Sequence, residues 1–181
     1  GGKSPNIVFD DADIEDAVSW SYAAAFANQG ENCNAGTRLF LHKDIKEIFL
    51  QKLLEKIKED TCIGDPLHED TTMGPLVSKE QFNKVLNYIE IGKQEGATVL
   101  CGGDVVTIGD GKGYFVAPTV FDGVTNNMRI AQEEIFGPVL SVLEFDNVQQ
   151  VLKEANDIPY GLAAVVHTKD LVKAHYMAKK L

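Results

Sequence analysis

Short apolar runs alternate along this chain with longer segments in which apolar residues recur every three or four positions. Runs of four to eight apolar residues are typical of buried strands, and the longer period is typical of helices that bury one face. The segments that predict strands are 6–9, 37–41, 98–101, 114–116, 118–121, 139–145 and 162–166. The segments that predict helices are 10–28, 44–59, 78–96, 147–156 and 170–181. Because parallel strands need crossover connections, this alternation predicts an α/β fold with a mainly parallel, doubly wound sheet flanked by helices.

Polar residues and glycines mark the ends of several predicted helices. Acidic residues at 10–13 suit the positive end of the first helix, and Gly30 is able to stop it. Ser78 and Gln81 fit a capping box, in which Ser78 is the N-cap and the Gln81 side chain reaches back to it. The glycine-rich stretch 109–113 matches no phosphate-binding motif and leads into a strand, so we expect a turn there.

Composition and charge narrow the classes of function. The chain has 181 residues, of which 44% are hydrophobic, which suits one globular domain with a full core. Its formal net charge is -10, the wrong sign for a nucleic-acid partner, because Lys and Arg supply most of the affinity for phosphate. No apolar run approaches the length of a membrane helix, so we expect no membrane partner.

The three cysteines, Cys33, Cys62 and Cys101, are far apart, and no two form a CxxC pair. The four histidines have no metal-ligand spacing with them, so we expect no metal site and no disulfide framework. Cys101 reads as a small core residue at the end of a strand, and Cys62 reads as a packing residue.

Cys33 has different surroundings. Amides and small residues flank it in the stretch 26–38, between a predicted helix and a predicted strand. Reactive cysteines lie partly exposed in polar loops, whereas structural cysteines usually have apolar neighbours. The residues alone therefore leave two interpretations open, a nucleophile and an ordinary loop cysteine.

A second unusual loop, 131–139, combines adjacent carboxylates, an aromatic residue and a Gly-Pro turn. The Cys33 stretch and this loop follow one another along the chain in the order typical of a known family. The chain resembles the catalytic domain of the NAD(P)-dependent aldehyde dehydrogenase superfamily over essentially its whole length. The motifs that carry the resemblance are Gly1-Gly2-Lys3-Ser4-Pro5, Gln29-Gly30-Glu31-Asn32-Cys33, Glu133-Glu134-Ile135-Phe136-Gly137-Pro138, and Asn156-Asp157 followed by Tyr160-Gly161-Leu162.

The resemblance implies that Cys33 is the nucleophile that attacks the aldehyde carbonyl. The thiolate would form a thiohemiacetal, whose oxyanion the Cys33 backbone N–H could hold. Hydride transfer to the nicotinamide would leave a thioester, and water would hydrolyse it to the carboxylic acid. Asn32 and Asn34, on either side of Cys33, would line the substrate.

The resemblance also implies cofactor contacts for NAD or NADP. Glu134 matches the family glutamate that binds the hydroxyls of the nicotinamide ribose, and a carboxylate accepts two hydroxyl protons well. Phe136 matches the aromatic residue beside the nicotinamide. Gln81 and Lys84 match helix positions that contact cofactor ribose in some family members. Gln81 has the capping interpretation as an alternative, and Lys84 has that of a solvated lysine.

The resemblance implies missing parts as well. The family's general base is a glutamate just before the position at which this chain begins, and the family's cofactor-binding domain precedes it. We therefore expect 1–181 to be a catalytic domain truncated at both ends, with little or no dehydrogenase activity in isolation. The parent enzyme would be a homodimer or homotetramer of the cytoplasm or the mitochondrion.

Three alternatives remain at this point. Within the family, an acylating relative would pass the thioester to coenzyme A instead of water. Outside it, the chain could be a folded α/β module without catalysis. A thiol hydrolase that acts through a Cys–His pair would need one of His42, His68, His167 or His175 beside Cys33.

Overall fold

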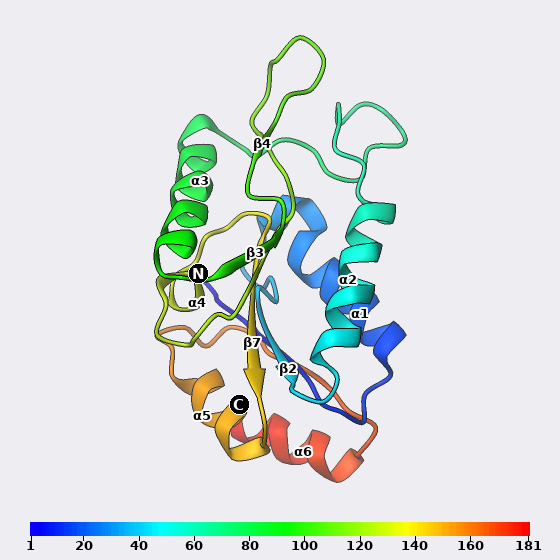
Figure 1. Cartoon of the computed structure of the whole chain (residues 1–181), viewed down its shortest axis with the longest axis vertical. Helices are drawn as coiled ribbons and strands as arrows, with labels where there is room; N and C mark the ends of the chain where they lie inside the picture. The colour runs from blue at the N-terminus through cyan, green and yellow to red at the C-terminus, as the bar shows by residue number, and fades with distance from the viewer.

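Six strands form the central sheet of the computed structural model, which describes residues 1–181 (Figure 1). Their order across the sheet is β3 (Thr98–Cys101), β6 (Thr119–Asp122), β7 (Val139–Phe145), β2 (Arg38–His42), β1 (Pro5–Val8) and β8 (Val165–His167). All neighbouring pairs are parallel except β3 and β6, which are antiparallel. The predicted α/β fold with a mainly parallel sheet is confirmed.

Helices cover both faces of this sheet because its strands are apolar on both sides. In β2, Leu39 and Leu41 belong to one core cluster, and Phe40 between them belongs to the other. The first cluster packs against α1 (Ile14–Phe26) and α2 (Lys46–Asp60). The second packs against α3 (Lys79–Gln94), α5 (Val148–Asn156) and α6 (Leu171–Lys180). Figure 1 shows α1 and α2 on the right, α3 on the left, and α5 and α6 at the bottom.

The first helix is shorter than its apolar pattern predicts. Asp13 is the N-cap, and its carboxylate accepts a hydrogen bond from the Asp16 backbone N–H, so the helix does not start at residue 10. It ends at Phe26, and a 3₁₀ turn, η1 (Ala27–Gly30), follows. Within this turn Asn28 and Gln29 take left-handed conformations, with φ of 52° and 59°. The α-helix therefore stops two residues before the predicted end.

The predicted edge strand 162–166 is also different. Only Val165–His167 pair with β1, opposite Asn6 to Val8. Residues 162–164 have no strand partner and remain exposed. The predicted strand 114–116 is β5 (Phe115–Val116), which forms a hairpin with β4 (Val105–Val106). The apolar pattern missed β4 and the helix α4 (Arg129–Gln132) because both are short.

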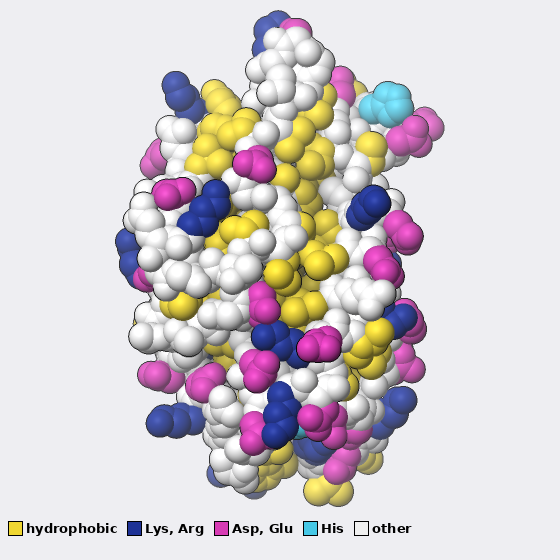
Figure 2. Space-filling model, in the orientation of Figure 1, with side chains coloured by type: hydrophobic (Ala, Val, Ile, Leu, Met, Phe, Trp, Pro, Cys, Tyr) yellow, Lys and Arg dark blue, Asp and Glu magenta, His cyan; other side chains and the backbone are white.

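The glycine-rich stretch 109–113 is the turn that the sequence predicts, at the tip of the β4–β5 hairpin that projects at the top of Figure 1. Figure 2 shows hydrophobic side chains gathered below this hairpin, between α3 and α2, with charges of both signs around them. No helix of the structure is long and apolar enough to cross a membrane.

The capping box is half correct. Ser78 Oγ accepts a hydrogen bond of 3.1 Å from the Gln81 backbone N–H. The Gln81 side chain, however, does not return to Ser78, because its amide binds carbonyls of another loop. The packing role predicted for Cys62 is wrong, since Cys62 is exposed on a connecting loop. Cys101 is partly buried against the cluster beside α1 and α2, and burial raises the pKa of its thiol.

Candidate functional site

Four segments meet at one edge of the sheet, where its parallel strands begin. Gly1–Gly2 precede β1, Cys33 precedes β2, Glu134–Phe136 precede β7, and Leu162 precedes β8. Because these strands are parallel, the residues before them come to the same edge. Ligands of open α/β sheets usually bind at the opposite edge, where the strands end. The candidate site therefore lies at the amino edge.

Gly2 joins the thiol loop to the carboxylate loop. Its backbone N–H donates a hydrogen bond of 2.9 Å to Oε1 of Glu134. On its other side, a Cβ at Gly2 would lie 2.2 Å from the Cys33 carbonyl oxygen, so no side chain fits there. A Cβ at Gly1 would lie 2.4 Å from Oε2 of Glu134. The two glycines thus keep the space between Cys33 and Glu134 free of side-chain atoms.

The Cys33 loop is held by its own polar side chains. Asn32 Nδ2 donates to the Ala27 carbonyl at 2.8 Å, and Asn28 Nδ2 donates to the Glu31 carbonyl at 3.1 Å. Cys33 itself is exposed, and its backbone N–H donates no hydrogen bond within the chain. A free N–H next to an exposed thiol is the arrangement that an oxyanion on the same residue requires.

Two further hydrogen bonds tie this loop to the segment before α3. Gln29 Oε1 accepts from the Gly74 backbone N–H, and Glu31 Oε1 accepts from that of Val77, both at 3.2 Å. Burial raises the pKa of Glu31, while the hydrogen bond from Val77 lowers it. The carboxylate nearest to Cys33 in sequence is therefore engaged by the backbone of another loop.

The adjacent carboxylates Glu133 and Glu134 have different partners. Both oxygens of Glu133 accept hydrogen bonds of 2.9 Å from the Arg129 guanidinium, and Oε2 also accepts from the Tyr88 hydroxyl at 2.6 Å. These hydrogen bonds, first those of Arg129, lower the pKa of Glu133 to about 2. Glu134 has only the Gly2 N–H as a partner, so its Oε2 remains available to accept a ligand hydroxyl.

Phe136 follows in a left-handed conformation, with φ of 58°, and its ring is half-buried. Gln81 Nε2 donates to the carbonyls of Ile135, at 2.9 Å, and Phe136, at 2.6 Å. Lys84 lies one helical turn after Gln81 on α3 and forms no ion pair or hydrogen bond within the chain. The structure thus brings Gln81 to the Glu134–Phe136 loop and leaves Lys84 unengaged.

Two basic residues, Lys3 and Arg38, follow Gly2 and Cys33 in the chain. Lys3 is fully buried, its Nζ has no hydrogen-bond partner, and burial, aided by the charge of Arg38, lowers its pKa to about 7. Arg38 is the basic residue nearest to Cys33 in sequence, but its guanidinium binds Asn126 Oδ1 and the carbonyls of Glu154 and Ala155. Arg38 therefore stabilises the end of α5 rather than the thiol.

No histidine forms a hydrogen bond with Cys33. His42 Nε2 pairs with the Asp146 carbonyl, and His167 Nε2 pairs with Asn6 Oδ1. His68 lies beside Asp70 on an exposed loop, and His175 is on α6. A Cys–His pair needs direct hydrogen-bond contact, so the structure removes the thiol-hydrolase alternative.

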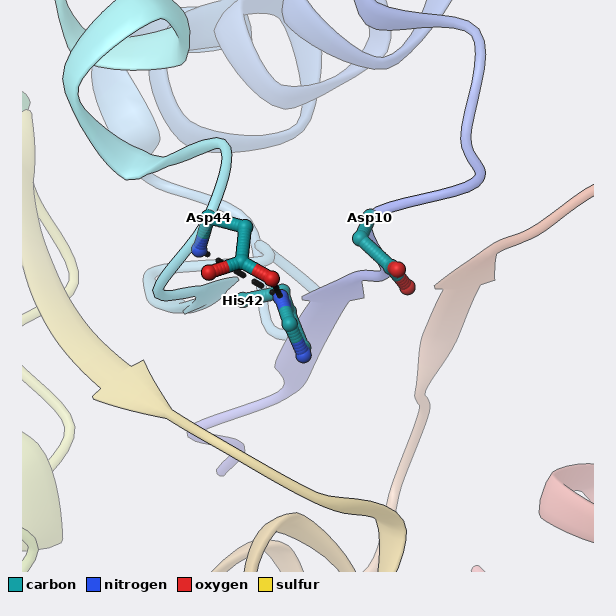
Figure 3. A group of neighbouring side chains, drawn as sticks. All are labelled: Asp10, His42 and Asp44. Carbon is teal, nitrogen blue, oxygen red and sulfur yellow. Dashed lines mark hydrogen bonds and ion pairs between the residues drawn. The ribbon is translucent and has the colours of Figure 1, made fainter.

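The chain holds one group of side chains with metal-ligand spacing, Asp10, His42 and Asp44 (Figure 3). Their ligand atoms lie within 4.8 Å of one another, and Asp44 faces the His42 ring at 3.7 Å. His42 is the last residue of β2, whereas Cys33 precedes that strand, so the group lies at the opposite edge of the sheet. It takes no part in the thiol site.

The family resemblance predicts roles for Cys33, Glu134 and Phe136, and the structure places their loops at one edge of the sheet. Asn32 holds the Cys33 loop through Ala27, while Asn34 is exposed beside the thiol. The role of Gly2 as a bridge was missed. Two consecutive glycines, two residues before a buried strand, were the available signal, because such positions favour close backbone approach.

Comparison with known proteins agrees with this arrangement. The model of the aldehyde dehydrogenase family matches residues 1–181. Betaine aldehyde dehydrogenase of Brucella anthropi is 53% identical over 176 residues, which are 97% of this chain and 36% of that protein. Betaine aldehyde dehydrogenase of Mesorhizobium japonicum is 53% identical over 182 residues, covering 100% of this chain and 37% of that protein.

Solved structures give the same result. An indole-3-acetaldehyde dehydrogenase in complex with NAD+ superposes with a TM-score of 0.97 at 49% identity. The NAD+ complex of an aldehyde dehydrogenase from Bacillus cereus superposes with a TM-score of 0.96 at 48% identity. Each match covers 100% of this chain and 36% of the solved chain, so this chain spans little more than a third of these relatives. The chain belongs to the aldehyde dehydrogenase family.

Proposed function

We propose that this chain supplies the nucleophilic thiol of an NAD-dependent aldehyde dehydrogenase that oxidises an aldehyde to a carboxylic acid. The observation that carries the proposal is the Gly2 bridge, which contacts the Cys33 carbonyl on one side and the Glu134 carboxylate on the other. The thiol can bind an aldehyde, and the carboxylate can bind the diol of a nucleotide cofactor. Because Gly1 and Gly2 lie against both groups, the arrangement suits a reaction between the bound aldehyde and the cofactor.

The residues present fit the nicotinamide end of such a cofactor. Glu134 has one carboxylate oxygen without a partner, Phe136 offers a half-buried ring, and a side chain at Gly1 would collide with Glu134. We propose that Glu134 binds the ribose hydroxyls and that Phe136 lies beside the nicotinamide. Lys84, unengaged on α3, is a second candidate for a ribose contact. NAD is the cofactor of the two solved relatives described above.

In the proposed mechanism the Cys33 thiolate adds to the aldehyde carbon, and the carbonyl π electrons move to oxygen. The free Cys33 N–H then holds the resulting oxyanion. NAD, held at its nicotinamide end by Glu134 and Phe136, would supply the hydride acceptor that the oxidation of the thiohemiacetal to a thioester requires. A water molecule next attacks the thioester, releases the acid and returns the thiolate. By the family resemblance, the base that activates this water is a glutamate.

The proposed substrate is an aldehyde, and no individual aldehyde is proposed. Relatives of about equal identity are named for betaine aldehyde and for indole-3-acetaldehyde, so similarity over this chain does not select the substrate. Asn34, exposed beside Cys33, and Asn32 are the candidates for lining the substrate side. The curated relatives come from bacteria, which supports the cytoplasm rather than the mitochondrion. A homodimer or homotetramer is proposed for the parent enzyme by family resemblance alone.

The test uses a chimera in which this chain replaces the matching 37% of the Mesorhizobium japonicum protein. We expect aldehyde-dependent NADH production by the chimera, its loss in Cys33→Ala, and its retention in Cys62→Ala. An absolute requirement for coenzyme A would favour the acylating alternative. Activity that survives in Cys33→Ala would disprove the proposed role of the thiol.

The isolated 181-residue chain is the second arm of this test. We propose that it has little or no dehydrogenase activity, because it spans little more than a third of its relatives. Robust NADH production by the chain alone would contradict this expectation. A chimera that folds but stays inactive with every aldehyde would favour the alternative of a folded module without catalysis.

A further inference from the structure

The amide of Gln81 uses both of its donor hydrogens on two consecutive backbone carbonyls. Nε2 lies 2.9 Å from the Ile135 oxygen and 2.6 Å from the Phe136 oxygen. An amide NH₂ group has two donors, so this pair satisfies it completely. No other group of the chain donates to either carbonyl. A single side chain therefore supplies all the hydrogen bonds that these two carbonyls receive.

The turn that Gln81 binds is strained. Phe136 has φ of 58°, a left-handed conformation that is unfavourable for a non-glycine residue. Strained residues persist only where their surroundings hold them, and they cluster at functional sites. Phe136 lies outside every helix and strand, so the hydrogen bonds of a neighbouring element have to hold its backbone.

The α3 helix is well placed for this task. Ser78 caps its first turn through the Gln81 backbone N–H, which fixes the base of the Gln81 side chain. One turn later Val85 is fully buried, and a Cβ at Gly137 would lie 2.4 Å from its Cγ2. The turn is thus bound by α3 at Phe136 and packed against α3 at Gly137.

The residue before Glu134 is also held by hydrogen bonds. Glu133 accepts hydrogen bonds from Arg129 and from Tyr88, another residue of α3. Glu134 lies between the Glu133 anchor and the Gln81 anchor, and its own contact is with Gly2. Holding the backbone on both sides of one carboxylate restricts where that carboxylate can lie.

We propose that Gln81 is a positioning residue, which holds the Glu134–Phe136 turn so that the Glu134 carboxylate stays on Gly2, facing the Cys33 loop. This inference rests on the proposed function and assigns Gln81 to the loop carbonyls instead of the cofactor ribose. Gln81 acts on cofactor affinity through Glu134. Glutamate at position 81 is nearly isosteric but has no N–H, so its carboxylate would face two carbonyl oxygens.

The first readout is hydrogen exchange in the 181-residue chain, which needs no cofactor. Within 133–137 the Glu133 amide is the one that donates a hydrogen bond, to the Arg129 carbonyl at 2.8 Å. We expect it to exchange about tenfold faster in Gln81→Leu, since the turn that follows it loses hydrogen bonds worth about a factor of ten. Amides inside α3 should keep their protection. Gln94→Leu removes an exposed amide of the same helix, which binds only Glu90, and is the matched control. Gln81→Glu is a second variant, to be used if Gln81→Leu does not fold.

The second readout is steady-state kinetics of the chimera. We expect Gln81→Leu to raise KM for NAD about tenfold with kcat within about twofold, because Glu134 binds the cofactor and does not react. Unchanged exchange in 133–137 would overturn the proposal. A raised KM with unchanged exchange would also overturn it, since Gln81 would then contact the cofactor directly. A chimera inactive without any substitution would reject the proposed function, whereas the exchange result would still decide the role of Gln81.

Discussion

The backbone N–H of Gly2 donates a 2.9 Å hydrogen bond to the Glu134 carboxylate, although the two residues are 132 positions apart. The same glycine lies against the Cys33 carbonyl, with no room for a side chain. This contact couples the backbone of the thiol loop to the position of the carboxylate. A disturbance at Gly2 is therefore expected to reach both groups at once.

Substitution of Gly2 by alanine tests this coupling. The added Cβ would lie 2.2 Å from the Cys33 oxygen, so one of the two segments must move. We expect Gly2→Ala to lower the free energy of unfolding by about 1–3 kcal/mol, the usual effect of overpacking, and to abolish activity of the chimera. Urea denaturation of the chain and NADH production by the chimera measure the two effects.

Gly161→Ala is the control for stability, because a Cβ there meets nothing within 4 Å. Its unfolding free energy should stay within about 0.5 kcal/mol of the unsubstituted chain. If Gly2→Ala and Gly161→Ala unfold at the same urea concentration, the close contact at Gly2 is not a structural constraint.

Thiol labelling distinguishes the three cysteines. Cys33 and Cys62 are exposed, whereas Cys101 is partly buried and burial raises the pKa of its thiol. Because the thiolate is the reactive form, we expect two thiols to react rapidly with a disulfide reagent and Cys101 to react slowly. Cys33→Ala and Cys62→Ala should each remove one rapid equivalent. Loss of a rapid equivalent in Cys101→Ala would contradict the assignment.

Lys3 gives a pH-dependent prediction. Burial lowers its pKa from 10.5 to about 7, so between these values the unfolded chain binds more protons than the folded one. The free energy of unfolding therefore rises with pH across this window, by up to about 1.4 kcal/mol per pH unit. Below pH 7 the penalty for burying the charge is fully present.

Replacement of Lys3 by methionine isolates this effect. Lys3→Met should be more stable than the unsubstituted chain below pH 7, and this advantage should shrink as the pH rises toward 10.5. Urea denaturation at pH 6, 8 and 9.5 gives the comparison. A stability difference that is constant over this range would show that Lys3 keeps its ordinary pKa in the folded protein.

Glu133 predicts the opposite pH response. Hydrogen bonds from Arg129 and Tyr88 lower its pKa from 4.5 to about 2, so the stabilisation is present above pH 4.5 and is lost as the pH falls toward 2. Because the pair with Arg129 is largely exposed, its contribution should be within about 1 kcal/mol. Glu133→Gln should be less stable than the unsubstituted chain at pH 6 and equal to it near pH 2. Equal stability at both pH values would show that the ion pair contributes nothing.

Much of the fold was predictable, because both sheet faces are covered and the buried strands are rich in apolar residues, although Asn6, Arg38 and Ser141 interrupt them. β7 matches its predicted bounds. β1, β2 and β6 are shifted by one residue from their predicted bounds. β5 was predicted, but its hairpin partner β4 was not predictable, since it has only two residues. The antiparallel pairing of β3 with β6 depends on tertiary packing that no local pattern shows.

Some contacts of the candidate site follow from local motifs, and others do not. Ser78 caps α3 as its local motif indicates, because the cap is formed within one turn. The Gln81 side chain had a local partner and a distant one, and it binds the distant carbonyls. Similarly, Cys62 resembles a packing residue in sequence but lies on an exposed loop. When a side chain has both a local and a long-range partner within reach, the fold determines which of them it binds. Sequence spacing does not describe the fold.

The position of the thiol at the amino edge also determines when the site can exist during folding. Each of its segments is held in place by the strand that follows it, and β1 pairs with β8, the last strand of the chain. Pairing of such distant strands is slow, because loop closure precedes the gain from contacts. A growing chain therefore exposes Cys33 long before Glu134 can join it. Gly2, Cys33 and Glu134 come together only when β7, more than a hundred residues after β1, has joined the sheet beside β2.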